Sequence, residues 1–217
     1  PKGLIKLSCP PVMMEHQIRP LLNQFLKEHP HVDVEMELTS RRVDVLHDDI
    51  DLAIRTNFGV NEDSSIIVRD VVKTTHCLVI SPELLQGRTI EHVTQINDYP
   101  TIVLGTQKAH YHWHLHNLKY QDEIKILLEP RIKSNDLAGV YYAVLDGLGI
   151  ADLPYLTVKE DIEAGRLIHL LPDWCSNLGT VQLVYASRKG QRLVMEKLIE
   201  HLIEGVRNYA PTQEGYL

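Results

Sequence analysis

The chain has 217 residues, of which 44% are hydrophobic and 24% are charged, and its formal net charge is −7. A chain of this size and composition can bury a full core, as one domain or as two smaller lobes, which excludes a disordered polypeptide. The negative charge and the dispersed lysines and arginines disfavour direct contact with a nucleic-acid backbone.

The first part of the chain predicts strands that alternate with helices. Residues 4–9 are typical of a strand, and Pro10-Pro11 open a helix that ends before Pro30. Apolar and acidic residues alternate over 32–38, as in a strand with one exposed face. We then expect a short helix at 43–46 and strands at 51–55, 65–72 and 75–80. Repeated strand–helix–strand units predict a mostly parallel sheet covered by helices.

The character of the chain changes at Ser81-Pro82, where a short helix over 82–86 begins a second set of strands and helices. A helix over 135–147 is well defined, because side-chain caps precede it and Gly147 suits its C-terminal cap. After it we expect a strand to residue 154, a helix over 155–164, strands at 166–171 and 180–186, and an amphipathic helix over 193–206.

These elements predict two lobes of the α/β class. If the strand at 180–186 returns to the first lobe, two segments cross between the lobes, with hinges near 80–82 and 179–181. Lobe I then comprises 1–80 and 180–208, lobe II comprises 81–179, and 209–217 form a flexible tail. The predicted architecture is a pair of Rossmann-like lobes with a ligand cleft and two crossover strands.

Six segments occur in the order and spacing of one protein family. They are 3–10 with the long helix after it, 25–30 (FLKEHP), 51–55 (DLAIR), 63–65 (DSS), 78–85 (LVISPELL) and 147–154 (GLGIADLP). Together they resemble the effector-binding domain of the LysR-type transcriptional regulators. The resemblance covers nearly the whole chain.

The resemblance implies a fold like that of type 2 periplasmic binding proteins and a small effector held between the lobes. It also implies a homodimer or homotetramer, and promoter DNA read only by an N-terminal winged helix-turn-helix domain that is absent from this chain. The family's pocket positions fall here on Ser8, Cys9, Pro10, Pro11, Thr39, Ser40, Ser134, Asn135 and Asp136. Many relatives carry a serine or threonine where this chain has Pro11, so one usual hydroxyl donor is missing.

The predicted site favours an anionic effector. If the helices that begin near Pro11 and Asn135 aim their N-termini at one ligand, each contributes roughly 0.3–1 kcal/mol toward a negative charge. Arg55 could add a bidentate contact, although a salt bridge to a carboxylate such as Asp51 is the ordinary alternative. Asp136 is most often a helix cap, and its charge would oppose an anion.

Four histidines, His110, His112, His114 and His116, alternate with apolar residues and would share one face of a strand. Same-face neighbours lie about 6.8 Å apart, so an adjacent pair such as His112 and His114 could share a metal ion, whereas the outer two could not. The ordinary alternative, which we favour, is a solvated histidine face over Tyr111, Trp113 and Leu115. We therefore expect neither a metal nor another cofactor.

The chain has three cysteines without close spacing, which disfavours a secreted disulfide scaffold and favours the cytoplasm. Cys9 lies beside a helix start, where a thiolate would be stabilised; the alternative is a buried residue that fills space. No apolar run reaches the roughly 18 residues of a membrane span, so no membrane partner is expected. Because the chain begins at Pro1, we expect a fragment or a processed product.

Two other function classes share the predicted fold. A solute-binding protein of a transporter is the first alternative, and it would carry a leader peptide, for which we find no pattern before Leu4. An enzyme is the second, but the sequence has no nucleophile elbow, phosphate loop or metal-binding helix motif. We therefore expect a ligand-sensing domain without catalysis.

Overall fold

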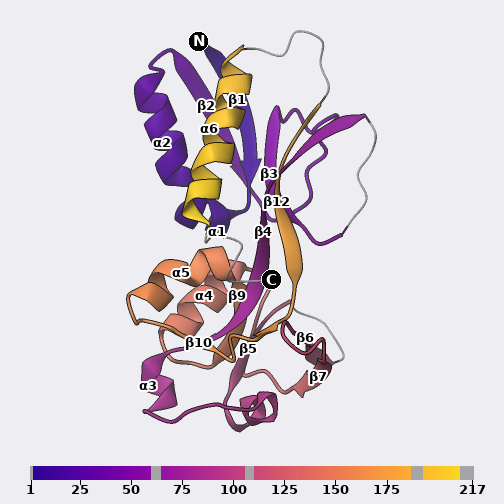
Figure 1. Cartoon of the computed structure of the whole chain (residues 1–217). Helices are drawn as coiled ribbons and strands as arrows, with labels where there is room; N and C mark the ends of the chain where they lie inside the picture. The colour runs from indigo at the N-terminus through magenta and orange to yellow at the C-terminus, as the bar shows by residue number, and fades with distance from the viewer. Residues whose placement is uncertain (1, 60–64, 106–109, 187–192, 211–217) are drawn as a thin grey trace. The chain divides into compact units, whose positions relative to one another are not determined.

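The structure of the chain is a computed structural model that describes residues 2–59, 65–105, 110–186 and 193–210. It divides into two compact units (Figure 1). Unit 1 contains the chain up to Thr74 and again from Gly179, and unit 2 contains Thr75–Leu178. Both units are of the α/β class, and the chain passes between them in two strands, which confirms the predicted fold class.

Unit 1 is built on a sheet in which β2, β1, β3 and β12 lie in that order. Strand β1 pairs in parallel with β2 and with β3, and β12 pairs antiparallel to β3. The strands are β1 (Gly3–Cys9), β2 (Val32–Leu38), β3 (Leu52–Asn57) and β12 (Leu178–Ala186). The parallel pairing of β1 brings the carboxyl ends of three strands to one edge of the sheet.

The alternating strand β2 has a less buried apolar face than its sequence indicates. Val32 is buried, whereas Met36 and Leu38 are 51% and 49% exposed. Strand β2 is the terminal strand of the sheet and pairs with β1 alone. The carboxyl half of an edge strand therefore keeps apolar side chains in contact with solvent.

The first helix runs without interruption over residues 11–28 in three segments, α1 (Pro11–Met13), the π-helix η1 (Met14–Ile18) and α2 (Arg19–Glu28). Pro20 has no N–H, and in a regular α-helix its ring would clash with the carbonyl of His16. The Arg19 N–H reaches back to the Met14 carbonyl, which widens the turn just before the proline. The helix ends at Glu28, ahead of Pro30, as predicted.

The C-terminal helix α6 (Leu193–Tyr209) packs beside α2, as Figure 1 shows for the yellow and indigo helices. His201 contacts the Leu21 carbonyl through Nε2 at 2.8 Å, and its ring lies 5.5 Å from that of Phe25. Tyr209 is still helical, so it does not belong to the tail that was expected over 209–217. Residues 211–217 lie outside the described residues.

The prediction of a short helix at 43–46 is wrong, because the chain forms only a turn here. The carboxylate of Asp44 accepts the Leu46 N–H at 2.9 Å, and that of Asp48 accepts the Asp44 N–H at 2.9 Å. Asp49 then adopts a positive φ of 56°. The Asp48 N–H closes a single turn on the Asp44 carbonyl at 2.8 Å, and the left-handed backbone of Asp49 prevents that turn from continuing as a helix.

The two strands expected at 65–72 and 75–80 are one strand, β4 (Ile66–Ile80). Neither glycine nor proline interrupts this segment, and β-branched residues dominate it, so nothing stops the extended chain. The chain passes from unit 1 to unit 2 inside β4, between Thr74 and Thr75, earlier than the expected boundary after residue 80.

Unit 2 contains two sheets. In the first, the carboxyl part of β4 is followed by β9, β5 and β8, and β10 also pairs with β4; in the second, β6 lies between β11 and β7. The parallel pairs are β5 with β8 and β5 with β9. The strands are β5 (Thr101–Leu104), β6 (Tyr111–Asn117), β7 (Glu123–Leu128), β8 (Ile132–Ser134), β9 (Ile150–Pro154), β10 (Ile168–Leu170) and β11 (Trp174–Cys175).

The α-helices of unit 2 agree with the helices predicted at 82–86, 135–147 and 155–164, whereas its 3₁₀-helix was not predicted. They are α3 (Pro82–Leu85), the 3₁₀-helix η2 (Val93–Asp98), α4 (Leu137–Leu145) and α5 (Tyr155–Glu163). Gly147 and Gly165 follow α4 and α5 with φ values of 70° and 72°. Among the described residues, no helix of the chain is both long and apolar enough to cross a membrane.

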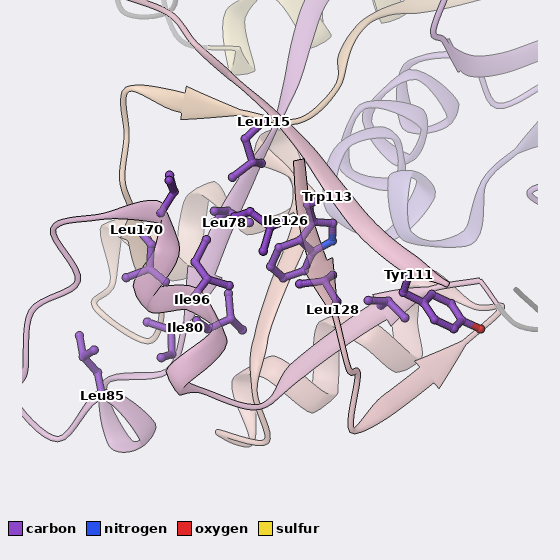
Figure 2. Packing of buried hydrophobic residues seen from close by; sticks show 13 residues of the cluster. Leu78, Ile80, Leu85, Ile96, Tyr111, Trp113, Leu115, Ile126, Leu128 and Leu170 are labelled. Atoms are coloured by element: carbon purple, nitrogen blue, oxygen red, sulfur yellow. The ribbon is translucent and has the colours of Figure 1, made fainter. Parts of the chain in front are cut away.

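The core beneath β6 and β7 joins the two sheets of unit 2. Figure 2 shows Trp113 and Leu115 of β6 and Ile126 of β7 packed against Leu78 and other apolar residues of the unit. Trp113 is 7% exposed and Leu115 is fully buried. This packing fixes the orientation of β6, because a shift by one residue would turn its histidines into the core.

A buried carboxylate connects α4, α5 and the loop after α5. Asp161, which is 4% exposed, accepts the Tyr141 hydroxyl at 2.7 Å and the Arg166 Nε–H at 2.6 Å. Burial and this hydrogen bond raise the pKa of the Tyr141 hydroxyl, which therefore stays a donor at neutral pH. Asp161 is thus the polar link between the two helices.

We predict that Asp161→Ala lowers the free energy of unfolding by about 1–3 kcal/mol, because the buried Tyr141 hydroxyl loses its acceptor. Urea denaturation followed by circular dichroism measures the change. Glu163→Ala is the matched control on the same helix, since its carboxylate is exposed and lies 3.9 Å from the Lys159 ammonium. Equal effects of the two substitutions would contradict the role of Asp161.

Candidate functional site

Three of the predicted ligand contacts, Ser8, Thr39 and Arg55, lie near the carboxyl edge of the unit 1 sheet. Ser8 is level with Glu37 of β2 and with Ala53 of β3. The Thr39 N–H donates to the Cys9 carbonyl at 3.0 Å, so the pairing of β1 with β2 extends past the strand ends. Extended by two residues, this register puts Pro10, just after β1, level with Thr39, just after β2, and with Arg55 of β3.

Side chains at one level of a sheet point to the same face, and the face changes with every residue. Ser8, Thr39 and Arg55 therefore project from one face of the unit 1 sheet. Ser8 is 2% exposed, whereas Thr39 and Arg55 are half-buried. The Thr39 hydroxyl accepts the Arg41 N–H at 3.2 Å, and Ser40 beside it is exposed. One face thus carries two hydroxyls and a guanidinium.

Cys9 lies on the opposite face of β1, with Ile5 and Leu7, and is fully buried. Burial raises the pKa of its thiol far above the ordinary value. These surroundings favour the alternative of a buried, space-filling residue over a reactive thiolate. The alternation of side chains along a strand could have indicated this, because Cys9 is the residue after Ser8 and must therefore point to the opposite face of the sheet.

The first helix begins without a side-chain cap. Pro10 occupies the N-cap position, Pro11 the first helical position, and the Pro10 carbonyl accepts the Met14 N–H at 2.9 Å. Proline at both positions offers no side-chain oxygen to the N–H groups of the first turn. This helix start is therefore suited to an external acceptor, and it follows directly from Ser8 and Cys9.

The predicted residues of unit 2 surround the start of α4. Ser134 ends β8 at the level of Leu104 of β5, so this group also lies at the carboxyl ends of parallel strands. The Ser134 hydroxyl donates to the Asp136 carbonyl at 2.9 Å and accepts the Asp136 N–H at 3.0 Å. Asn135 is exposed between them. The serine thus shapes the turn that precedes the helix.

Asp136 is the N-cap of α4, which agrees with the ordinary expectation for this residue. Its carboxylate accepts the Ala138 N–H at 3.3 Å. A carboxylate at this position already satisfies the donors and the dipole of the helix start. The N-terminus of α4 is therefore a poorer anion site than the uncapped start of the first helix.

The histidines of β6 form a solvent face, as predicted. His112 and His114 are exposed, His116 is half-buried, and Tyr111, Trp113 and Leu115 are buried. Among the described residues, the structure does not place the pair of His112 and His114, weighed as the less favoured alternative, in a cluster of potential metal ligands; instead, His114, His116 and Glu123 of β7 place three potential ligand atoms within 4.8 Å of one another. Sequence reasoning missed Glu123 because it belongs to the next strand.

A serine, a histidine and an aspartate also meet in unit 2. Asp152 Oδ2 accepts the Ser176 hydroxyl at 2.6 Å and lies 3.3 Å from His76 Nδ1. In a catalytic triad the serine donates to the histidine, which is held by the carboxylate. Here the serine donates to the carboxylate, so the arrangement does not activate a nucleophile.

Unit 2 also has a small pocket that sequence reasoning did not indicate. Its volume is about 390 Å³, and it is lined by His110, Tyr111, Leu127, Leu128, Glu129, Pro130 and Lys133. The Lys133 ammonium lies 5.1 Å from the centre of the Tyr111 ring. Lys133 precedes Ser134 and so points away from the strand-end group.

Comparison with known proteins identifies the family. Residues 1–207 match the model of the LysR substrate binding domain. The chain belongs to this family. This match confirms the predicted resemblance to the effector-binding domain of LysR-type regulators. The curated relatives described below are transcriptional regulators.

Relatives and solved structures of the LysR family agree with this assignment. The HTH-type transcriptional regulator PtxR of Pseudomonas aeruginosa is 28% identical over 207 residues, which are 93% of this chain and 65% of PtxR. The regulatory domain of AphB from Vibrio vulnificus has a TM-score of 0.78 and 25% identity, and the match covers 94% of this chain and 98% of that domain.

The regulatory domain of CrgA, a LysR-type transcriptional regulator from Neisseria meningitidis, has a TM-score of 0.81 at 22% identity. This match covers 95% of this chain and 100% of that domain, and it shows the shared fold. The chain spans only part of the length of its curated relatives. It covers 59% of an HTH-type transcriptional regulator from Haemophilus influenzae and 65% of PtxR.

We predict that native Cys9, Cys77 and Cys175 resist alkylation, because all three are buried and burial raises the pKa of each thiol. At pH 8, mass spectrometry should find little iodoacetamide label on the native protein and three labels after denaturation. Rapid labelling of Cys9 in the native protein would restore the thiolate hypothesis.

We predict that Asp136→Ala lowers the free energy of unfolding by about 1 kcal/mol, through loss of the α4 cap. Asp136→Asn should retain most of the stability, because the amide oxygen can accept the same N–H. Thermal melts compare the two variants. An unstable asparagine variant would mean that the charge of Asp136, and not its capping oxygen, is what matters.

Proposed function

We propose that this chain is the effector-sensing domain of a LysR-type transcriptional regulator that binds a small organic anion and does not transform it. The observation that carries the proposal is the alignment of Ser8, Thr39 and Arg55 on one face at the carboxyl edge of the unit 1 sheet. In open α/β sheets, this edge is where ligands bind.

The chemistry of the unit 1 edge supports a carboxylate ligand. The uncapped N–H groups of the first helix favour a negative charge by roughly 0.3–1 kcal/mol. A guanidinium that holds a carboxylate bidentately adds charge-assisted hydrogen bonds, and the Thr39 hydroxyl adds a neutral donor. Pro10 and Pro11 carry neither charge nor hydroxyl, so their contribution is to set the direction of the helix start.

The unit 2 group has a different role in this proposal. The start of α4 is already capped by Asp136, and the Ser134 hydroxyl is bound within the turn. The exposed amide of Asn135 can still donate to or accept from a ligand. We therefore assign hydrogen-bonding selectivity to the unit 2 residues and charge recognition to those of unit 1.

The proposed output is a change in DNA binding. An effector shifts the balance between conformations only by its differential affinity for them, and a homodimer or homotetramer passes this bias to the DNA-binding domains. Those domains lie outside the chain described here, and the regulatory relatives support their presence in the whole protein. Three free cysteines support the cytoplasm as its location.

The test is a thermal-shift screen with aromatic and aliphatic carboxylic acids. We predict that a cognate acid, at about 100 times its Kd, stabilises the protein by about 2.7 kcal/mol and raises Tm by several degrees. The double variant Thr39→Val/Arg55→Gln should weaken binding at least about tenfold, because it removes one neutral and one charged donor.

Thr94→Val is the matched control, since Thr94 is exposed on η2 and far in sequence from every candidate residue. Melts without ligand show whether each variant still folds. An unchanged response of the double variant to the acid would refute the unit 1 assignment. A response to neutral or cationic compounds alone would refute the anionic effector.

A further inference from the structure

Three side chains with metal-binding groups converge on the surface of the hairpin formed by β6 and β7. His114 Nε2 and His116 Nδ1 each lie 3.2 Å from a carboxylate oxygen of Glu123. The two imidazole centroids are 4.4 Å apart. The three potential ligand atoms all lie within 4.8 Å of one another.

The convergence is built into the strand geometry. His114 and His116 are two residues apart on β6 and so share a face, and Glu123 of β7 is directly opposite His116. Between the histidines, Leu115 is fully buried, and Trp113 anchors the same strand in the core shown in Figure 2. Packed side chains thus hold the backbone that presents the three groups, which is the support that a binding site needs.

The spacing suits a tetrahedral ion. Zinc binds histidine nitrogen and carboxylate oxygen at about 2.0–2.2 Å, so two ligands at a tetrahedral angle lie about 3.3 Å apart. The separation between His114 Nε2 and Glu123 Oε2, or that between His116 Nδ1 and Glu123 Oε1, is 3.2 Å and already matches this value. The other separations among the three ligand atoms, which are at most 4.8 Å, have to shorten, and rotation of these solvent-accessible side chains achieves this.

The ordinary alternative is a pair of exposed histidine–carboxylate hydrogen bonds, which would contribute little to stability. The exposed pair of His47 and Asp44 shows this simpler case, with one imidazole 2.7 Å from one carboxylate. On β6, two imidazoles converge on the same carboxylate. Two neutral imidazoles and one carboxylate form the donor set of many zinc sites, and they leave a fourth position for water.

We propose that His114, His116 and Glu123 form an exchangeable site for a divalent late transition-metal ion such as zinc. The ion ties β6 to β7 at the surface of unit 2. The site shares no residue with the proposed effector contacts, so it is independent of the proposed function. Its exposed ligands, 51%, 36% and 59% accessible for His114, His116 and Glu123, make it a site of exchange with solution zinc.

The test is calorimetric titration of Zn²⁺ into untagged protein that has been dialysed against a chelator. We expect one saturable site per chain. His114→Asn, His116→Asn and Glu123→Gln should each weaken binding at least about tenfold, because loss of a metal ligand should cost no less than loss of an outer-shell partner. Titration with Co²⁺ should produce the strong visible absorption of a four-coordinate ion, which the three variants lose.

His47→Asn is the matched control and should bind Zn²⁺ like the unsubstituted chain, because His47 belongs to an exposed pair in unit 1. Melts of the zinc-free variants confirm that each one folds. The absence of a saturable site in the unsubstituted protein would overturn the proposal. Binding that survives all three ligand substitutions, or that His47→Asn abolishes, would also overturn it.

Discussion

The parallel register of β1 with β2 and β3 is the constraint on which the unit 1 site depends. It fixes both the level and the face of each side chain at the sheet edge, so Thr39 and Arg55 lie on the same face on either side of β1 although they are far apart in the sequence. A slip of one residue in either pairing would turn one of these side chains to the opposite face, where Cys9 is buried. The proposed ligand site therefore depends first on backbone hydrogen bonding and only then on any single side chain.

The same rule of alternation explains why β6 is buried on one face and presents histidines to solvent on the other. Trp113 and Leu115 enter the core, and this burial forces His114 and His116 outward. Burial of the large apolar side chains, worth about 1.5–3 kcal/mol each, far exceeds what exposed histidine–carboxylate pairs contribute. The core thus sets the geometry of the surface cluster, and a metal ion would not need to organise the strand.

Local signals in the sequence predicted the elements that local chemistry determines. The cap at Asp136, the stop at Gly147 and the alternation of β6 are of this kind, and all three are present. The turn at 43–46 was missed because the chain leaves the helical conformation at Asp49, whose φ is positive although it is not a glycine. Glu123 was missed as a partner of His116 because hairpin register is a non-local property. The placing of Arg55 and Thr39 at one level, on either side of β1, likewise depends on the non-local register of the sheet.

The two strand-end groups differ in a way that bears on how an anion could be recognised. In unit 2 a helix start is closed by a carboxylate from its own chain, and in unit 1 a helix start is preceded by two prolines that offer no oxygen. An incoming carboxylate would duplicate a charge already present at α4, at an electrostatic cost, whereas at the first helix it would supply the missing acceptor. The prolines therefore do more than begin a helix. Because they offer no capping oxygen, they leave the first-turn donors to be satisfied by water or by a ligand, and the proposed selectivity for a negative charge rests on this difference.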